Sequence, residues 1–407
     1  MEFKLRNYQE DAVQNCNQIL QKYKLCILNG EVRTGKTHVA LDVAKNYQNV
    51  LFVTKKKAIS SIESDYHAAC HSFTWTIINY ESLHKITGKF DLVIVDESHS
   101  ISAFPKPSKR AKDLKKFCIN DVMLLTGTLI PESNSQIFHQ LWISKFSPFN
   151  RFKNFYAWFR KYGKPEIIYT AYGQSTSYKN SNWDLIKKEI DYLRVIVTQK
   201  DAGFKCEITN HFHTVTMKPQ TDALIKRLIK DRVIEGNNET IIADSPAKLQ
   251  QKVHQMSSGT IKFDSGERMV LDYSKAYFIA DKFKAKKKAI FYKFTAELHA
   301  IQSVLDVTQD IEEFNNSNKD IALQIVSGRE GTNLSAADCL IMYNIDFSAV
   351  SYWQARDRMT VLSRKENHVH WLFSDCGICS KVFQAVSNKF DYNLKLFKKD
   401  YGIKKND

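Results

Sequence analysis

The sequence has no run of about eighteen uncharged apolar residues, the length that a membrane-spanning helix needs. Residues 1–6 contain no apolar core of a secretion signal, so we expect the chain to stay in the cytoplasm of a bacterium or of a virus-infected host cell. Acidic residues are few beside basic ones: 44 Asp and Glu stand against 59 Lys and Arg, a net charge of +15. This excess favours a polyanionic partner, usually nucleic acid, although some basic proteins are merely soluble.

Closely spaced cysteines are almost lacking, because the eight cysteines lie scattered along the chain. Cys376 and Cys379 form the one close pair, and no second pair or His-x-x-x-His partner accompanies them. We therefore expect no structural zinc, and we interpret the pair as the first turn of a helix after Asp375.

With 407 residues the chain is too long for one compact core, so at least two domains are expected. Short apolar runs alternate with longer helical patterns, which predicts α/β domains with parallel sheets flanked by helices. These runs are residues 50–54, 76–79, 92–95 and 123–125, and then 289–294, 321–326, 339–344 and 369–373. We expect a first lobe over residues 1–148, a helical, aromatic and basic insertion over 149–210, a second lobe over 211–385, and a basic tail over 386–407.

Residues 30–37 read G-E-V-R-T-G-K-T, which is the G-x-x-x-x-G-K-T pattern of a phosphate-binding loop. An apolar run precedes the loop and a helix-prone stretch follows, which is the context that this motif requires. We expect Gly30, Thr34 and Gly35 to shape a loop whose N–H groups face the phosphates of ATP. Lys36 would reach the β- and γ-phosphates, and the Thr37 hydroxyl would bind Mg²⁺.

Two acids, Asp96 and Glu97, follow the apolar run at residues 92–95. A strand that ends in an acid is how a P-loop ATPase presents its metal-binding carboxylate, so Asp96 would bind Mg²⁺ and Glu97 would polarise the attacking water. The alternative is that the two carboxylates only cap a helix.

The order of motifs resembles that of superfamily-two helicases, and in detail the SWI/SNF-like group, in a small phage, viral or bacterial form. Asp96-Glu97-Ser98-His99 resembles the Asp-Glu-x-His box, and residues 124–128 resemble the Leu-Thr-Gly-Thr segment. The resemblance implies two RecA-like P-loop lobes, with Thr126 and Thr128 coupling the state of ATP to movement between them. Residues 5–9 are similar to the Leu-Arg-x-Tyr-Gln opening, which implies that Gln9 contacts adenine, and residues 79–81 match the Asn-Tyr-Glu element.

The resemblance continues through the second half of the chain. Lys275 resembles the lysine of the Ser-Lys element that opens the second lobe, and residues 331–334 resemble the Gly-x-Asn-Leu core of the fifth motif. Residues 354–358 resemble the Gln-Ala-x-x-Arg of the sixth motif, which implies that Gln354 contacts the nucleotide. The Arg358 guanidinium is expected to stabilise the charge that builds on the γ-phosphate. The alternative interpretation is that Arg358 is a solvated surface arginine.

One departure from the family pattern concerns hydrolysis. The family has a second arginine three residues after the first, and here that position is Val361, which cannot donate a hydrogen bond to a phosphate. Either Arg358 suffices, or Arg356 or Arg364 takes the second role, or hydrolysis is slow.

The basic residues predict contacts to the nucleic-acid backbone rather than to bases. Six residues are expected to contact DNA. Four are basic, one is a threonine and one is a tyrosine: Lys55, Lys56, Lys293, Arg329, Thr54 and Tyr80. The basic run at residues 106–116 has two open interpretations, a solvated face or a DNA contact. The aromatic residues around Trp158 are more often core than stacking platforms, and we favour a helical subdomain with DNA at its edge.

The leading functional hypothesis is a DNA-dependent ATPase that translocates on or remodels duplex, branched or forked DNA in replication, recombination or repair. The alternative, motivated by Val361, is a weakly hydrolysing DNA-binding subunit that positions a partner such as a nuclease or a replication protein. An RNA-directed or strand-separating helicase differs only in its preferred substrate, which the sequence does not fix.

Overall fold

The computed structural model describes residues 4–131, 133–170, 173–205, 207–236, 239–328, 334–348, 351, 355–360, 366–388 and 392–402. The chain divides into two compact units, Met1–Phe204 and Lys205–Asp407. Among the described residues no helix combines the length and apolar character needed to cross a membrane.

Unit 1 is built on a six-stranded sheet whose strand order is β3-β2-β4-β5-β1-β8, and all its pairings are parallel. Its strands are β1 (Leu25–Gly30), β2 (Asn49–Thr54), β3 (Thr74–Asn79), β4 (Leu92–Val95), β5 (Asp121–Thr126) and β8 (Arg194–Val197). Its helices are α1 (Asn7–Tyr23), α2 (Lys36–Ala44), α3 (Ile59–Ala68), α4 (Lys109–Lys115), α5 (Ile137–Trp142), α6 (Phe155–Tyr162) and α7 (Trp183–Ile190).

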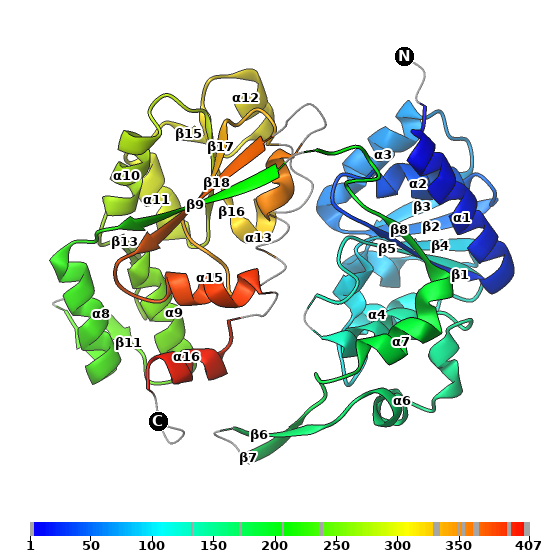
Figure 1. Ribbon diagram of the computed structural model, residues 1–407, viewed down its shortest axis with the longest axis horizontal. Helices are drawn as coiled ribbons and strands as arrows, with labels where there is room; N and C mark the ends of the chain where they lie inside the picture. Colours follow the sequence, from blue (N-terminus) through cyan, green and yellow to red (C-terminus); the bar gives the residue numbers. More distant parts are fainter. Residues whose placement is uncertain are drawn as a thin grey trace. The chain divides into compact units, whose positions relative to one another are not determined.

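Alternation of side chains along the strands explains why helices cover both faces of this sheet. Cys26 and Leu28 of β1 pack with buried residues of α1, α2 and α3 in one core. Leu25 and Ile27 of the same strand pack with residues of α4, α5, α6 and α7 in the other (Figure 1). Because the central strands β1, β2, β4 and β5 are buried on both faces, they read in the sequence as largely continuous apolar runs.

Unit 2 has a second six-stranded parallel sheet, with the order β15-β16-β14-β17-β18-β9. Its strands are β9 (Glu207–Val215), β14 (Lys288–Tyr292), β15 (Val307–Thr308), β16 (Asp320–Gln324), β17 (Cys339–Met342) and β18 (Glu366–Ser374). Two short hairpins accompany it, β10 (Val233–Glu235) with β11 (Thr240–Ile242), and β12 (Thr260–Lys262) with β13 (Arg268–Val270). The helices are α8 (Pro219–Asp231), α9 (Pro246–Ser257), α10 (Ser274–Lys282), α11 (Thr295–Gln302), α12 (Ile311–Asn316), α13 (Ile325–Gly328), α15 (Cys379–Ser387) and α16 (Leu394–Asp400).

The predicted architecture of two parallel-sheet α/β lobes is confirmed, and each apolar run predicted as a strand overlaps one. Cys376 precedes Gly377, which has a positive φ of 95°, and Cys379 begins α15. The stretch expected to be a basic tail contributes Tyr392 and Phe397 to the core of unit 2, so it packs on that unit rather than standing apart.

The stretch between the two predicted lobes contains more than helices. Its aromatic helix α6 buries Phe155, Trp158, Phe159 and Tyr162 in the core of unit 1, as the core interpretation expected. Helix α7 follows, and between the two helices lies an antiparallel hairpin, β6 (Glu166–Thr170) with β7 (Gly173–Ser177), in a stretch that was predicted to be helical (Figure 1). Strand β8 belongs to the same stretch and completes the sheet of unit 1 beside β1.

Candidate functional site

The predicted phosphate loop connects the end of β1 to the start of α2, at the carboxyl edge of the sheet of unit 1. Gly35 caps α2 in the left-handed conformation with φ 75°, where a residue with a Cβ would be strained. The Lys36 ammonium donates to the carbonyls of Gly30 at 2.8 Å and Glu31 at 3.1 Å. A Cβ at Gly30 would lie 2.7 Å from Lys36 Cγ, so glycine is needed for the lysine to cross the loop.

The first turn of α1 packs on this loop. Gln9, which is 6% exposed, donates from Nε2 to the Thr34 carbonyl at 3.4 Å, and the Tyr8 hydroxyl donates to the same carbonyl at 3.1 Å. A Cβ on Gly35 would lie 2.1 Å from Gln9 Nε2, which shows how closely the glutamine approaches the loop. Gln9 therefore lies beside the phosphate loop, and its contact with adenine stays a prediction.

The two predicted catalytic acids lie at the end of β4, on the same edge of the sheet. Asp96 accepts hydrogen bonds from Thr54 Oγ1 at 2.7 Å and from the Glu97 N–H at 2.9 Å. Burial and the neighbouring charge of Glu97 raise the pKa of Asp96 to about 6, while the Thr54 hydroxyl and the Lys36 charge oppose this rise. A buried carboxylate beside a second one is a local excess of negative charge, which a divalent cation would balance.

His99 connects these acids to the segment after β5. Its Nδ1 lies 3.2 Å from Glu97 Oε2 and 3.2 Å from Thr126 Oγ1, and the Thr126 hydroxyl also accepts the Thr128 N–H at 3.1 Å. A Cβ on Gly127 would lie 3.5 Å from the Gly30 carbonyl oxygen and 3.8 Å from Lys36 Nζ. The predicted coupling segment therefore lies beside the phosphate loop and is linked to Glu97 through His99.

The chain segment after β8 contacts the phosphate loop through Gln199, which was not predicted to have a role. The Gln199 N–H donates to Glu31 Oε2 at 2.6 Å, and Gln199 Nε2 donates to the Val32 carbonyl at 3.1 Å. Tyr8 and His99 had no predicted role either, although both lie inside the motifs at residues 5–9 and 96–99. No local signal marks Gln199, because its contacts depend on β8 pairing with β1.

Comparison with known proteins finds a family match within the second unit. Residues 251–360 match the family described as the helicase conserved C-terminal domain. This stretch of the chain is therefore similar to a helicase C-terminal domain. The predicted resemblance to helicases is confirmed by this match, which spans α9 to the short helical turn Asp357–Met359.

Among solved structures, the chain is similar to the Sulfolobus solfataricus SWI2/SNF2 ATPase core in complex with dsDNA. The two are 16% identical, the match covers 98% of this chain and 93% of that one, and the TM-score is 0.46. No curated protein matches the chain.

Within the matched residues 251–360, two predicted motifs meet through the main chain. The Arg358 carbonyl accepts the N–H of Leu334, the last residue of the predicted fifth motif, at 3.4 Å. Lys275 is fully buried, and its ammonium donates to the carbonyls of Tyr343 and Leu372 at 3.0 Å each, so it joins strand ends inside unit 2. Gln354, Arg329, Val361 and residues 331–333 lie outside the described residues.

Three residues predicted to contact DNA have partners inside the protein. Thr54 is fully buried and Tyr80 is 3% exposed, and both hydroxyls donate to Asp96, Thr54 to the carboxylate and Tyr80 to the main-chain carbonyl. The Lys293 side chain is 15% exposed and forms an ion pair with Asp346 at 2.7 Å. A polar residue at a strand end can face inward, which spacing alone does not show. The contact of Lys293 with DNA stays a prediction. Lys55 and Lys56 are half-buried and exposed respectively, and their contact with DNA stays a prediction.

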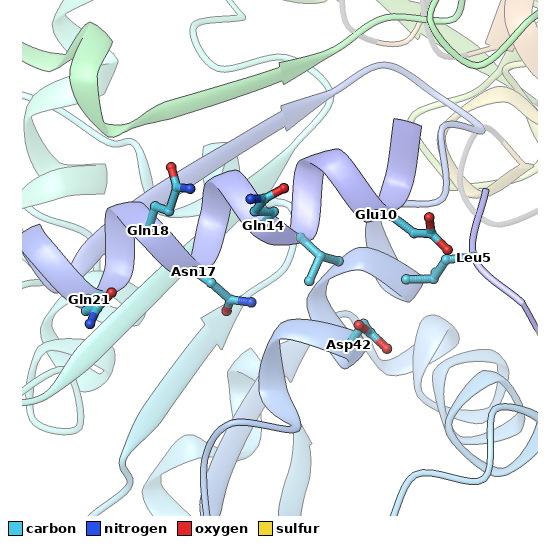
Figure 2. A pocket seen from close by; sticks show the side chains of 8 residues that line it. Leu5, Glu10, Gln14, Asn17, Gln18, Gln21 and Asp42 are labelled. Carbon is cyan, nitrogen blue, oxygen red and sulfur yellow. The ribbon is translucent and has the colours of Figure 1, made fainter. Parts of the chain in front are cut away.

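A hollow of about 360 Å³ lies elsewhere in unit 1, between α1 and α2 (Figure 2). Its lining is acidic, amide and aliphatic, and consists of Leu5, Glu10, Val13, Gln14, Asn17, Gln18, Gln21 and Asp42. Because it presents carboxylates and no basic side chain, it is unsuited to a phosphate, and the candidate site remains the carboxyl edge of the sheet.

Proposed function

We propose that the chain is an ATP-hydrolysing motor that translocates on or remodels duplex, branched or forked DNA. The observation that carries the proposal is the assembly of Lys36, Asp96 and Glu97 at one edge of the sheet of unit 1, in a chain whose second unit matches the helicase C-terminal domain. The net charge of +15 supports a polyanionic partner.

In this proposal the loop residues bind the nucleotide. The N–H groups at the start of α2 and the Lys36 ammonium face the phosphates, and the helix dipole favours their negative charge. The donor set suits Mg²⁺, because the Thr37 hydroxyl and the Asp96 carboxylate are hard oxygen ligands and the buried carboxylate calls for a cation. When bound, the ion would neutralise charge on the phosphates.

Glu97 would accept a proton from the attacking water, and His99 would orient its carboxylate from 3.2 Å. Thr126 and Thr128 would respond to the state of the site through His99. The His99 ring and the Thr128 N–H both contact the Thr126 hydroxyl. Arg358, from the helicase domain, would stabilise charge that builds on the γ-phosphate.

Substitution of the loop lysine and of the acid tests this proposal. Lys36→Ala is expected to abolish ATP binding and turnover, and Glu97→Gln is expected to abolish turnover while ATP still binds. Circular dichroism and thermal unfolding check that both variants fold like the unaltered chain. Turnover that is unchanged in both variants would overturn the proposal.

Val361 favours the second candidate, a DNA-binding subunit that binds ATP and hydrolyses it slowly. Val361→Arg separates the two. A large rise in turnover would favour the weakly hydrolysing subunit, whereas brisk turnover that the substitution leaves unaltered would remove its basis.

A further inference from the structure

Two hydroxyl groups from neighbouring strand ends hold the acids of the candidate site. Strand β2 pairs in parallel with β4, with Val53 opposite Val95, so the next residue of each strand, Thr54 and Asp96, also lie side by side. Main-chain pairing continues to this level, because the Asp96 N–H donates to the Val53 carbonyl at 2.8 Å. The Thr54 hydroxyl is therefore placed by the sheet itself.

Thr54 fixes the Asp96 carboxylate. Its Oγ1 donates to Oδ2 at 2.7 Å, while Oδ1 accepts the Glu97 N–H at 2.9 Å. With one donor on each oxygen, the carboxylate plane has one orientation, and the remaining lone pairs are available to a cation. Thr54 is fully buried, so water does not replace its hydrogen bond.

Tyr80 fixes the other acid through the main chain. It directly follows β3, is 3% exposed, and donates from its hydroxyl to the Asp96 carbonyl. That carbonyl belongs to the peptide group that joins Asp96 to Glu97. Glu97 has the left-handed conformation with φ 49° and ψ 49°, which a residue with a side chain adopts only where its surroundings hold it. The tyrosine bond is one such restraint, because it holds the peptide group from which the Glu97 backbone continues.

We propose that Thr54 and Tyr80 are positioning residues with separate tasks in the proposed ATPase reaction. Thr54 orients the Asp96 carboxylate for magnesium, and Tyr80 orients Glu97 for the attacking water. The inference rests on the proposed function, which assigns the metal to Asp96 and the water to Glu97.

The first test separates magnesium binding from nucleotide binding. Thr54→Val keeps the volume and removes the hydroxyl, and it is expected to weaken ADP binding in magnesium by on the order of 10-fold, the effect typical of lost support for a metal ligand. Binding in EDTA should match that of the unaltered chain, since the phosphate loop is untouched. Thr54→Ser keeps the hydroxyl and should restore magnesium-dependent affinity, which a purely structural role of the methyl group would not allow.

The second test separates turnover from binding. Tyr80→Phe keeps the ring and removes the hydroxyl, and it is expected to lower kcat by on the order of 10-fold, with the affinity for magnesium and ADP unchanged. Thr54→Val should show the opposite pattern, a raised requirement for magnesium with kcat near normal once magnesium saturates. Thermal unfolding of each variant shows whether the fold is retained.

Equal magnesium-dependent affinity in Thr54→Val and the unaltered chain would overturn the role of Thr54, as would a Thr54→Ser variant no better than Thr54→Val. A normal kcat in Tyr80→Phe would overturn the role of Tyr80. An unaltered chain that binds nucleotide without turning it over would overturn the proposed function and the role of Tyr80 together. The role of Thr54 would still be decided by its binding measurement.

Discussion

The Gln199 N–H donates to Glu31 Oε2 at 2.6 Å, which ties the segment after β8 to the phosphate loop. A second bond, from the Glu31 N–H to the Val197 carbonyl at 2.9 Å, reinforces the attachment. The loop that is predicted to face the phosphates is thus held by the last stretch of unit 1 before unit 2 begins at Lys205.

Loss of the hydrogen bond between Gln199 and the Glu31 carboxylate is expected to make the loop less ordered. Glu31→Ala removes the acceptor of a charge-assisted bond at an exposed position, so we expect ATP affinity to fall by roughly 3- to 10-fold, measured by titration calorimetry. Glu31→Gln keeps an acceptor oxygen and serves as the matched control. If Glu31→Ala binds ATP as tightly as the unaltered chain, the bond between Gln199 and Glu31 does not help to shape the loop.

The assignment of helix α6 to the core of unit 1 can be tested by comparing a buried aromatic residue of the helix with an exposed one. Trp158 is fully buried and packs against Phe138 and Phe149, whereas Tyr156 is 41% exposed. Trp158→Ala should lower the free energy of unfolding by about 3–5 kcal/mol, and Tyr156→Ala by about 0.5 kcal/mol or less. Denaturant unfolding measures both, and similar effects from the two substitutions would refute the core assignment.

Four histidines stack on one face of the sheet of unit 2. His211 and His213 of β9 lie beside His368 and His370 of β18, with Nε2 to Nδ1 distances of 3.0 Å in the pairs 211–368 and 213–370. Burial, then the neighbouring histidines and Lys286, lower the pKa of His370 to about 3, and those of His211 and His213 are lowered as well. The charged groups facing this cluster are Lys282, Lys286 and Glu366.

This cluster predicts that unit 2 loses stability in mild acid. Below the ordinary histidine pKa of 6.5 the unfolded chain binds protons that the folded cluster does not, so stability falls as the pH drops from 6.5 towards about 3. We expect a loss of about 1–2 kcal/mol between pH 7 and pH 5 that depends on His370. His370→Phe keeps a flat ring without a titrating group and should reduce the pH slope of urea unfolding; an unchanged slope would contradict the prediction.

Arg358 is expected to act in hydrolysis rather than in nucleotide binding. Arg358→Ala should lower kcat by on the order of 10³-fold, the lower range for a transition-state arginine, with little change in ATP affinity. Lys226→Ala is a suitable control, because this exposed lysine of α8 forms a surface ion pair with Asp222. A kcat for Arg358→Ala within a few-fold of normal would assign the role to another residue.

Much of the fold and of the nucleotide site could be predicted from the sequence, because their signals are local. Strands buried on both faces read as apolar runs, and the loop of residues 30–37 and the acids at 96–97 are contiguous motifs. Strand β8 was not predicted, although residues 195–197 form a short apolar run.

The inward placement of Thr54 and Tyr80 could not be predicted, because it depends on which strands are neighbours. The sequence shows Thr54 next to three lysines, which suggested a surface contact, whereas the pairing of β2 with β4 turns its hydroxyl to Asp96. The contact of Gln199 with Glu31 joins residues 168 positions apart and carries no local signal.

The most direct test of the central claim is the steady-state ATPase rate, measured alone and with single-stranded, duplex and forked DNA or RNA. The account predicts strong stimulation by duplex or forked DNA, which Lys36→Ala abolishes. Stimulation by RNA alone would redirect the motor to RNA. An absence of turnover with every nucleic acid, despite ATP binding, would contradict the claim.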